Sequence, residues 1–309
     1  MKKISVLFLA LMLVFTVACG DGGVYKDAAT SLAEGNYSRA IELLDTIPNH
    51  NDKDGIRQEA EAAIALLEAE TAFRDAVETA ETINASIDSA TSVGQGLLDS
   101  DSIPFDDSTK TNLQIAISAL REMKTVIPDM PDELGSIKDE TDKLNTAVDY
   151  SRQLENLESA QEAFEYSVRV MTQITNPTGD FIVLRLSEIE IIGDIFGVTE
   201  DKDPNGLLNK QGGYTSATFF SSAYIDQSTV YSDLTYTKAT DGGGCVEVYA
   251  TVDGAIKRDT YLASLDGSGF TSGSHTILGT IVIRTSHYLT ASQQNELTEQ
   301  IKEKLIELR

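Results

Sequence analysis

Residues 132–175, DELGSIKDETDKLNTAVDYSRQLENLESAQEAFEYSVRVMTQIT, decide the architecture of this chain, together with Asn176-Pro177-Thr178-Gly179, which follow directly. Apolar side chains in the long stretch recur every three or four residues, which is the period of one helix face. An unbroken helix of this length would extend roughly 66 Å. Proline disfavours helix in the residue before it, and the glycine then loosens the chain. The sequence therefore predicts a long helix followed by a linker, residues 176–179, between two domains.

Helical patterns also fill the chain before this stretch. Residues 56–93 are rich in Ala and Glu, which are strong helix formers, and residues 108–126 carry a further apolar stripe. Gly94-Gln95-Gly96 predicts a break between these two helices. A narrow apolar stripe with charges on the other faces is typical of a bundle or a coiled-coil seam. Residues 24–175 are therefore expected to form an elongated all-α stalk; a groove for an apolar ligand is the less favoured alternative.

The composition changes after residue 179 to Gly, Thr, Ser, Tyr and β-branched residues. Residues 214–222 and 245–251 alternate as strands do, and His275–Ser286 is the most strand-like run, expected at the centre of a sheet. Residues 181–192 and 253–265 have helical spacing. Thr290, with Gln293 three residues later, predicts a capping box for a final helix. We expect residues 180–309 to form a small α+β head domain, a mixed sheet with helices on one face.

The first 18 residues have the features of a secretory signal peptide. Lys2 and Lys3 form a basic start, residues 4–17 are almost wholly apolar, and the small Ala18 precedes Cys19. The apolar run is shorter than the roughly 20 residues that a transmembrane helix needs. The sequence predicts removal of residues 1–18, with residues 19–23 left as a tether.

Ala18-Cys19 resembles the lipobox of bacterial lipoproteins, with Thr16 at a position where that family usually has Leu. The resemblance implies that Cys19 receives a diacylglyceryl group and becomes the lipidated N-terminus. The chain would then be anchored to the cell membrane on its extracytoplasmic side. One acyl chain binds a membrane only marginally, whereas two anchor a protein stably.

The charge of the chain limits its partners. The formal net charge is −25, and removal of residues 1–18 would take away only two lysines, so 22 basic residues would face 49 acidic ones, a net charge of −27. Nucleic-acid binding depends on Lys and Arg that displace counterions from phosphates, so nucleic acid is not expected as a partner. Anionic lipid would repel the body of the protein, which leaves the lipid on Cys19 as the membrane contact.

Two further resemblances concern the two expected domains. Ala29, Leu32, Gly35, Tyr37, Ala40 and Leu44 follow the order of a tetratricopeptide-type helical hairpin over residues 24–48. Such repeats need three or more copies to bury a continuous core, and no second copy follows, so a single hairpin that caps a bundle is favoured over a peptide-binding groove. Residues 180–309 are similar to an uncharacterised domain of Gram-positive surface lipoproteins, through Asp203-Pro204-Asn205-Gly206, Gly212-Gly213-Tyr214 and Ile283-Arg284-Thr285-Ser286. That family implies location and architecture, and no activity.

One loop has half of a calcium-binding pattern. Asp201, Asp203 and Asn205 place oxygen ligands at alternate positions before Gly206, as in the opening of an EF-hand loop. The twelfth position, where that loop needs a bidentate Glu, is Gly212. The favoured alternative is a type I turn, because Asp-Pro-Asn-Gly suits its four positions.

A second candidate is the glycine run Gly242, Gly243 and Gly244 before a strand, whose backbone N–H groups could form an anion-binding nest. A tight loop or bulge is favoured, because glycines often punctuate strands. Cys245 is expected to be a small buried hydrophobic residue. If Cys19 carries lipid, Cys245 has no partner for a disulfide. Arg284, at the end of an apolar strand, is expected to pair with a carboxylate.

The sequence contains no catalytic signature: the histidines do not cluster, and no Gly-x-Ser-x-Gly elbow or zinc-binding pattern is present. No catalytic residue and no cofactor is predicted, apart from the calcium alternative. The hypothesis is a lipid-anchored envelope protein that is not an enzyme and binds an envelope protein or a cell-wall component. The alternatives are a cell-wall-directed enzyme with its site in the C-terminal domain, a calcium-binding surface protein and a spacer without a ligand.

Overall fold

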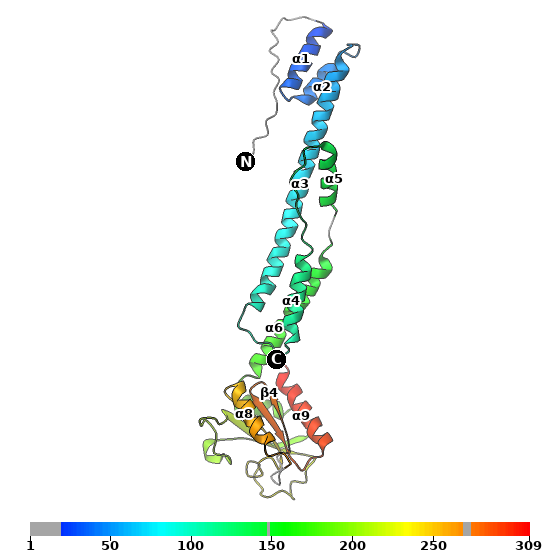
Figure 1. Cartoon of the computed structure of the whole chain (residues 1–309). Coiled ribbons are helices and arrows are strands. Elements are labelled where there is room, and N and C mark those ends of the chain that lie inside the picture. Colours follow the sequence, from blue (N-terminus) through cyan, green and yellow to red (C-terminus); the bar gives the residue numbers. More distant parts are fainter. Residues whose placement is uncertain (1–19, 147–148, 268–272) are drawn as a thin grey trace. The chain divides into compact units, whose positions relative to one another are not determined.

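The computed structural model describes residues 20–146, 149–267 and 273–309 (Figure 1). Its helices are α1 (Asp21–Ala33), α2 (Tyr37–Asp45), α3 (Lys53–Leu98), α4 (Ser108–Arg121), α5 (Leu134–Leu144), α6 (Ser151–Gln173), α7 (Gly179–Leu186), α8 (Val252–Ala263) and α9 (Ala291–Ile306), with a 3₁₀ turn η1 (Glu200–Lys202). Its strands are β1 (Ile192–Gly197), β2 (Ser216–Ser222), β3 (Gly243–Val248), β4 (Ser274–Leu278) and β5 (Ile281–Thr285). The chain is thus a mixed α+β protein, as predicted.

The chain divides into two compact units. The first comprises Met1–Ala90 and Leu120–Arg152, and the second comprises Thr91–Ala119 and Gln153–Arg309. Each is described below by itself.

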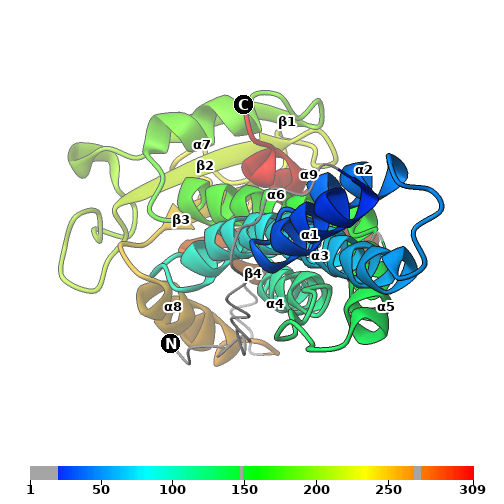
Figure 2. The ribbon, with the colours of Figure 1, turned by 90° about the horizontal axis from the view of Figure 1, so that it is seen from above.

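The first unit is helical. α1 and α2 form a hairpin, in which Ala28 and Leu44 are fully buried and pack with Ile56 at the start of α3 (Figure 2). Gly35 adopts a φ of +79° in the turn between them, a conformation that glycine reaches without steric cost. Further along α3, Ala69 and Phe73 pack against Ile137 of α5. In the structure the two helices of this hairpin are Asp21–Ala33 and Tyr37–Asp45.

Two expectations for the helices are wrong. α3 continues through Gly94-Gln95-Gly96 to Leu98, because packing outweighs the low helix propensity of glycine. A Cβ on Gly94 would lie 3.1 Å from Ile117 of α4, so a residue without a side chain lets α4 approach closely. The long helix expected over residues 132–175 is interrupted, since α5 ends at Leu144 and α6 begins at Ser151.

The second unit contains a five-stranded sheet with the order β1-β2-β3-β5-β4. Every neighbouring pair is antiparallel, so the expected mixed sheet is wrong. The reason is the split connection β3-α8-β4: β3 and β4 run in the same direction, but β5 lies between them and opposes both. The single strand expected over His275–Ser286 is two strands, because Gly279, at a φ of +60°, turns the chain between β4 and β5.

Helices cover both faces of the sheet rather than one. Ile182 and Leu186 of α7 and Leu297 and Ile301 of α9 pack with Val246 on one face. The other face packs against α8 through buried side chains that include Tyr214, Phe219, Cys245, Ala255 and Leu262. Figure 2 shows the sheet between α7 on one side and α8 on the other. The predicted capping box of α9 is confirmed, with Thr290 and Gln293 making both reciprocal hydrogen bonds.

The end of α6 is hydrogen-bonded to the turn between β4 and β5. The Ile174 carbonyl accepts from the backbone N–H of Thr280 (3.4 Å) and from its hydroxyl (3.2 Å). The backbone N–H of Asn176 donates to Thr280 Oγ1 over 2.7 Å, and Thr215 Oγ1 donates to Asn176 Oδ1 over 2.7 Å. Within the second unit, α6 therefore meets the sheet at the end where β3 finishes and β5 begins.

Candidate functional site

The predicted lipidation site, Cys19, lies outside the described residues. Among the helices that the structure describes, none is both long and apolar enough to cross a membrane.

The predicted calcium loop is a self-contained turn. Both oxygens of Asp203 accept hydrogen bonds: Oδ1 from the N–H of Asn205 (3.0 Å) and from the Tyr214 hydroxyl, and Oδ2 from the N–H groups of Leu207 (2.6 Å) and Leu208 (2.8 Å). Asp201 Oδ1 accepts from the Thr199 hydroxyl over 2.6 Å. Within the described parts of the chain, no group of three or more His, Cys, Asp or Glu side chains is placed to hold a metal ion. The loop geometry favours the turn alternative.

The same contacts affect the pKa values of Asp203 and Tyr214. Burial acts to raise the pKa of Asp203, but the hydrogen bonds from Tyr214, Leu208, Asn205 and Leu207 outweigh it and lower the pKa. Burial and the hydrogen bond to Asp203 raise the pKa of Tyr214. A carboxylate that is already saturated by donors has little to offer a cation.

Replacement of Asp203 by Ala is expected to destabilise the chain by about 1–3 kcal/mol, because three backbone N–H groups and a hydroxyl lose their acceptor. Asp201→Ala, at an exposed position, is the control and should change little. Millimolar calcium should leave the thermal midpoint of the wild type unchanged. A midpoint that rises with calcium, and no longer does so in Asp203→Ala, would establish the calcium alternative instead.

The predicted anion nest is part of the sheet. Gly243 donates its N–H to the Thr240 carbonyl, and its own carbonyl accepts from Ser286. A Cβ on Gly244 would lie 2.3 Å from the Arg284 carbonyl oxygen and 2.4 Å from the Phe220 ring. A Cβ on Gly243 would lie 2.5 Å from the Ser222 nitrogen. The glycines therefore allow close strand packing, which fits the alternative to the nest.

A buried ion cluster lies between the sheet and α8. Glu247 of β3 is fully buried and accepts from Arg258 Nε and Nη2 and from Arg284 Nη1, each over 2.8 Å. The Tyr249 hydroxyl donates to the same carboxylate over 2.9 Å. Burial acts to raise the pKa of Glu247, but hydrogen bonds and charges of the two arginines outweigh it and lower the pKa. The pairing expected for Arg284 is confirmed, and its carboxylate partner is Glu247.

Two other reactive side chains lie on this face of the sheet: Cys245, which is buried, and His275, which contacts two carboxylates. Cys245 is fully buried, as predicted, and burial together with Glu247 raises the pKa of its thiol. His275 contacts Asp259 through Nδ1 (2.6 Å) and Asp266 through Nε2 (3.2 Å). The sequence did not reveal this contact, because the partners lie on α8 and just after it. Both ring nitrogens face carboxylates, so this histidine acts as a bridge between the sheet and α8.

The surface best suited to binding is built on the long connection 223–242 between β2 and β3. This loop is held firmly to its scaffold: Val230 belongs to the core beside α7 and α9, while Tyr236 packs on the other face against Phe196, with ring centroids 4.8 Å apart. The Gln227 side chain donates to the carbonyls of Ser222 (3.2 Å) and Gly242 (2.7 Å). Lys238 Nζ in turn donates to Gln227 Oε1 over 3.1 Å.

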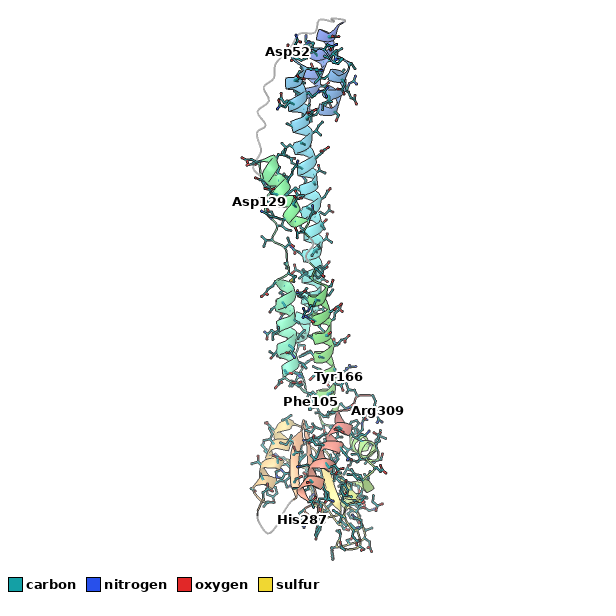
Figure 3. The ribbon with its side chains drawn as sticks, turned by 90° about the vertical axis from the view of Figure 1, so that its right-hand side faces the viewer. Asp52, Phe105, Asp129, Tyr166, His287 and Arg309 are labelled. Atoms are coloured by element: carbon teal, nitrogen blue, oxygen red, sulfur yellow. The ribbon has the colours of Figure 1, made fainter. Side chains whose placement is uncertain are left out.

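Between these anchors the loop turns large side chains outward. Tyr231 is 91% exposed, Leu234 is 53% exposed, and Tyr224, at the start of the loop, is 37% exposed. Tyr288 follows β5 at the same end of the sheet and is 57% exposed, beside His287, whose Nδ1 lies 3.5 Å from Asp241 Oδ1. We call Tyr224, Tyr231, Leu234 and Tyr288 the tyrosine surface. Figure 3 shows Tyr166 of α6 and His287 on opposite sides of the sheet.

The backbone of this loop adopts two uncommon conformations. Ser232 has a φ of +80° and Ala239 has a φ of +52°, in a region that residues with a Cβ seldom occupy. Such conformations cost energy, and they are concentrated at functional sites, where the surrounding contacts hold them in place. The sequence does not reveal this surface. Its only signal was a long connection rich in Tyr, Ser, Thr and Asp, which a loop without function would also show.

Comparisons of the chain with protein-family models, with curated proteins and with solved structures find no match.

Proposed function

We propose that this chain is a lipoprotein, anchored to the cell membrane through Cys19 on the extracytoplasmic side, that acts as a non-catalytic binding module of the envelope. In this proposal residues 24–175 form a helical stalk and residues 180–309 form a head. The ligand is another envelope component, bound at the tyrosine surface.

The observation that carries the proposal is the exposure of Tyr231 and Leu234 on a loop whose own residues fix it to both faces of the sheet, with the exposed Tyr288 at the same end of the sheet after β5. Tyrosine is enriched at protein interfaces, since it offers a large apolar ring with a polar tip and few rotatable bonds. Binding residues are often found on loops held by a rigid scaffold. The surface lies at the end of the sheet remote from α6, where Tyr231, Leu234 and Tyr288 are exposed and the Tyr224 side chain is hydrogen-bonded to Glu296 of α9.

A non-catalytic role also agrees with the ion pairs that the charged side chains of the second unit form with one another. Glu247 is paired with Arg258 and Arg284 in the interior, and His275 is bridged by two aspartates. These groups contribute to stability and specificity of the fold. A catalytic pair of titratable groups would need to converge on an open cleft.

The test is photo-crosslinking in cells that express the full chain, with a photoreactive amino acid at Tyr231, at Tyr288 or at Tyr261. Tyr261 is the matched control, because it lies on α8 and is also exposed (55%). We expect the same adduct from positions 231 and 288 and none from 261. Adducts from all three positions, or from none, would contradict the proposed surface.

Substitution of both Tyr231 and Tyr288 by Ser is expected to reduce partner recovery by about 30-fold or more, as for removal of binding hot spots worth about 2 kcal/mol. The thermal midpoint should stay close to that of the wild type, because both rings are largely exposed.

Cys19→Ser should release the chain from the membrane fraction and abolish the lipid label. Retention of the lipid label in that variant would contradict the anchor.

A further inference from the structure

A second surface, in the first unit, has a different chemical character. α3 uses one face, through Ala69 and Phe73, to pack against Ile137 of α5. Another face, which carries Ile64, Leu67 and Thr71 at helical spacing, lines a groove with the turn and first residues of α2. Leu67 is 50% exposed in the interior of a long helix. Leu67 therefore presents apolar surface to solvent on this face of α3.

The groove lies between Gly35–Arg39 on one side and Ile64, Leu67 and Glu68 on the other, and has a volume of about 520 Å³. A shallower hollow of about 380 Å³ continues along α3, lined by Leu67, Glu68, Thr71, Ala72 and Asp75. The two share Leu67 and Glu68, so they adjoin each other along α3, and we call them together the channel; only its first part has a second wall, from the turn before α2 and the start of α2. From Ile64 to Asp75 the helix rises roughly 17 Å, which is about three helical turns.

The edges of this channel are acidic. Glu42 of α2 and Glu68 and Asp75 of α3 line it, and the one basic side chain among the lining residues, Arg39, is already paired with Glu42 over 3.0 Å. Glu68 and Asp75 are exposed, and their carboxylates make no hydrogen bond or ion pair with the rest of the described chain. The channel thus combines an apolar floor with unneutralised negative charge.

We infer that this channel binds an amphipathic helix of another protein, with apolar side chains on one face and Lys or Arg on both flanks. The apolar face of the helix would cover Ile64 and Leu67, while its basic flanks would meet Glu68 and Asp75. A helix is the occupant that fits a straight groove along another helix. The net charge of −25 attracts a basic partner and repels a second copy of this chain. The channel is separate from the tyrosine surface, so the two proposals hold or fail independently.

The probe is a display library of random 18-residue peptides, panned on the purified chain from residue 20 to residue 309. We expect the enriched peptides to have apolar residues spaced three and four apart, with Lys and Arg beside them. One enriched peptide is then synthesised, and its affinity is measured for the wild type, Leu67→Ser, the double variant Glu68→Lys/Asp75→Lys, and Ile115→Ser. Ile115 is the matched control, an aliphatic residue on α4 in the second unit that is 62% exposed and is not among the residues that line the channel.

Leu67→Ser is expected to weaken binding at least tenfold, and the charge-reversed variant at least as much, whereas Ile115→Ser should leave the affinity unchanged. Binding should also weaken when the salt concentration is raised from 0.1 M to 0.5 M, because the charges are exposed. Unchanged thermal midpoints would show that the variants fold. Binding that is equal in Leu67→Ser, enrichment without basic residues, or no enrichment at all would overturn the inference. So would a dimer of the free chain that Leu67→Ser dissociates, because the occupant would then be a second copy.

Discussion

Replacement of Glu247 by Ala is expected to destabilise the second unit by about 3–5 kcal/mol, the largest effect that we predict for a substitution in this protein. The substitution removes the carboxylate of Glu247, which is wholly excluded from solvent. Arg258 and Arg284 then remain charged in the interior without their partner. An uncompensated buried charge costs far more than the net contribution of an intact pair. The Tyr249 hydroxyl also loses its acceptor.

The measurement is urea unfolding of the chain from residue 20 to residue 309, followed by near-ultraviolet circular dichroism of the buried tyrosines. Tyr249 contacts Glu247 directly, so its signal reports on the affected region. Glu247→Gln should be less damaging than Glu247→Ala, because the amide oxygen still accepts one or more of the hydrogen bonds. Glu299→Ala, which removes an exposed pair with Lys302, is the control and should cost less than about 1 kcal/mol. A loss below that size for Glu247→Ala would show that the cluster contributes nothing to the fold.

The same cluster predicts a pH dependence with a definite sign. The pKa of Glu247 is lower in the folded state than in the unfolded chain, so the unfolded state binds its proton more readily. Its contribution is therefore fully present above the unfolded pKa of about 4.3 and is lost as the pH falls below that value. In the wild type, unfolding free energy should fall on acidification below about pH 4.3, and Glu247→Gln should lack this component.

Gly244→Ala is expected to have the second largest effect, and to prevent stable assembly of the sheet. The new methyl group would lie 2.3 Å from the Arg284 carbonyl oxygen, which is backbone of β5, and 2.4 Å from the Phe220 ring on β2. Because β3 is held between these two strands, relief of one contact worsens the other. Overpacking of a core by a methyl group typically costs 1–3 kcal/mol, and contact with backbone on one side places this case at about 3 kcal/mol or more.

Thermal unfolding and the yield of soluble chain measure this effect. Gly96→Ala is the matched control in the same unit, because that glycine lies in α3 and has open space where its Cβ would be. The control should be stabilised by up to about 1 kcal/mol, since alanine is the better helix former. A Gly244→Ala variant as stable as the wild type would mean that the strands are more loosely packed than their backbone positions indicate.

Sequence reasoning found the elements whose signals are local. The hairpin around Gly35, the Thr290–Gln293 capping box and the strands around residues 216–222 and 243–248 each follow from residues close together in the chain. The predictions that were wrong concern elements whose conformation depends on contacts between residues far apart in the sequence. Gly94 is helical because Ile117 packs against it, and the turn at Gly279-Thr280 was hidden within a run of β-branched residues.

Candidate sites were predicted less well than elements. The residues of the calcium pattern are in one loop, but Asp203 is used by Tyr214, eleven positions later, as an internal hydrogen-bond acceptor. The cluster around Glu247 joins β3, α8 and β5, and no sequence pattern connects these elements. The sequence does not show whether a tyrosine in a loop is exposed to solvent. Tyr231 is almost fully exposed, whereas Tyr236, in the same loop, packs against Phe196.

The attachment of α6 to the β4–β5 turn has a mechanical consequence. Thr280 ties the last turn of α6 to one end of the sheet, and the tyrosine surface occupies the other end. If a ligand bound to the tyrosine surface is pulled away from α6, the force acts along the direction of the strands. Antiparallel ladder hydrogen bonds lie perpendicular to the strands, so they resist such a pull together, in shear, rather than opening one after another. The second unit is thus strongest in the direction in which a ligand held at its far end would pull.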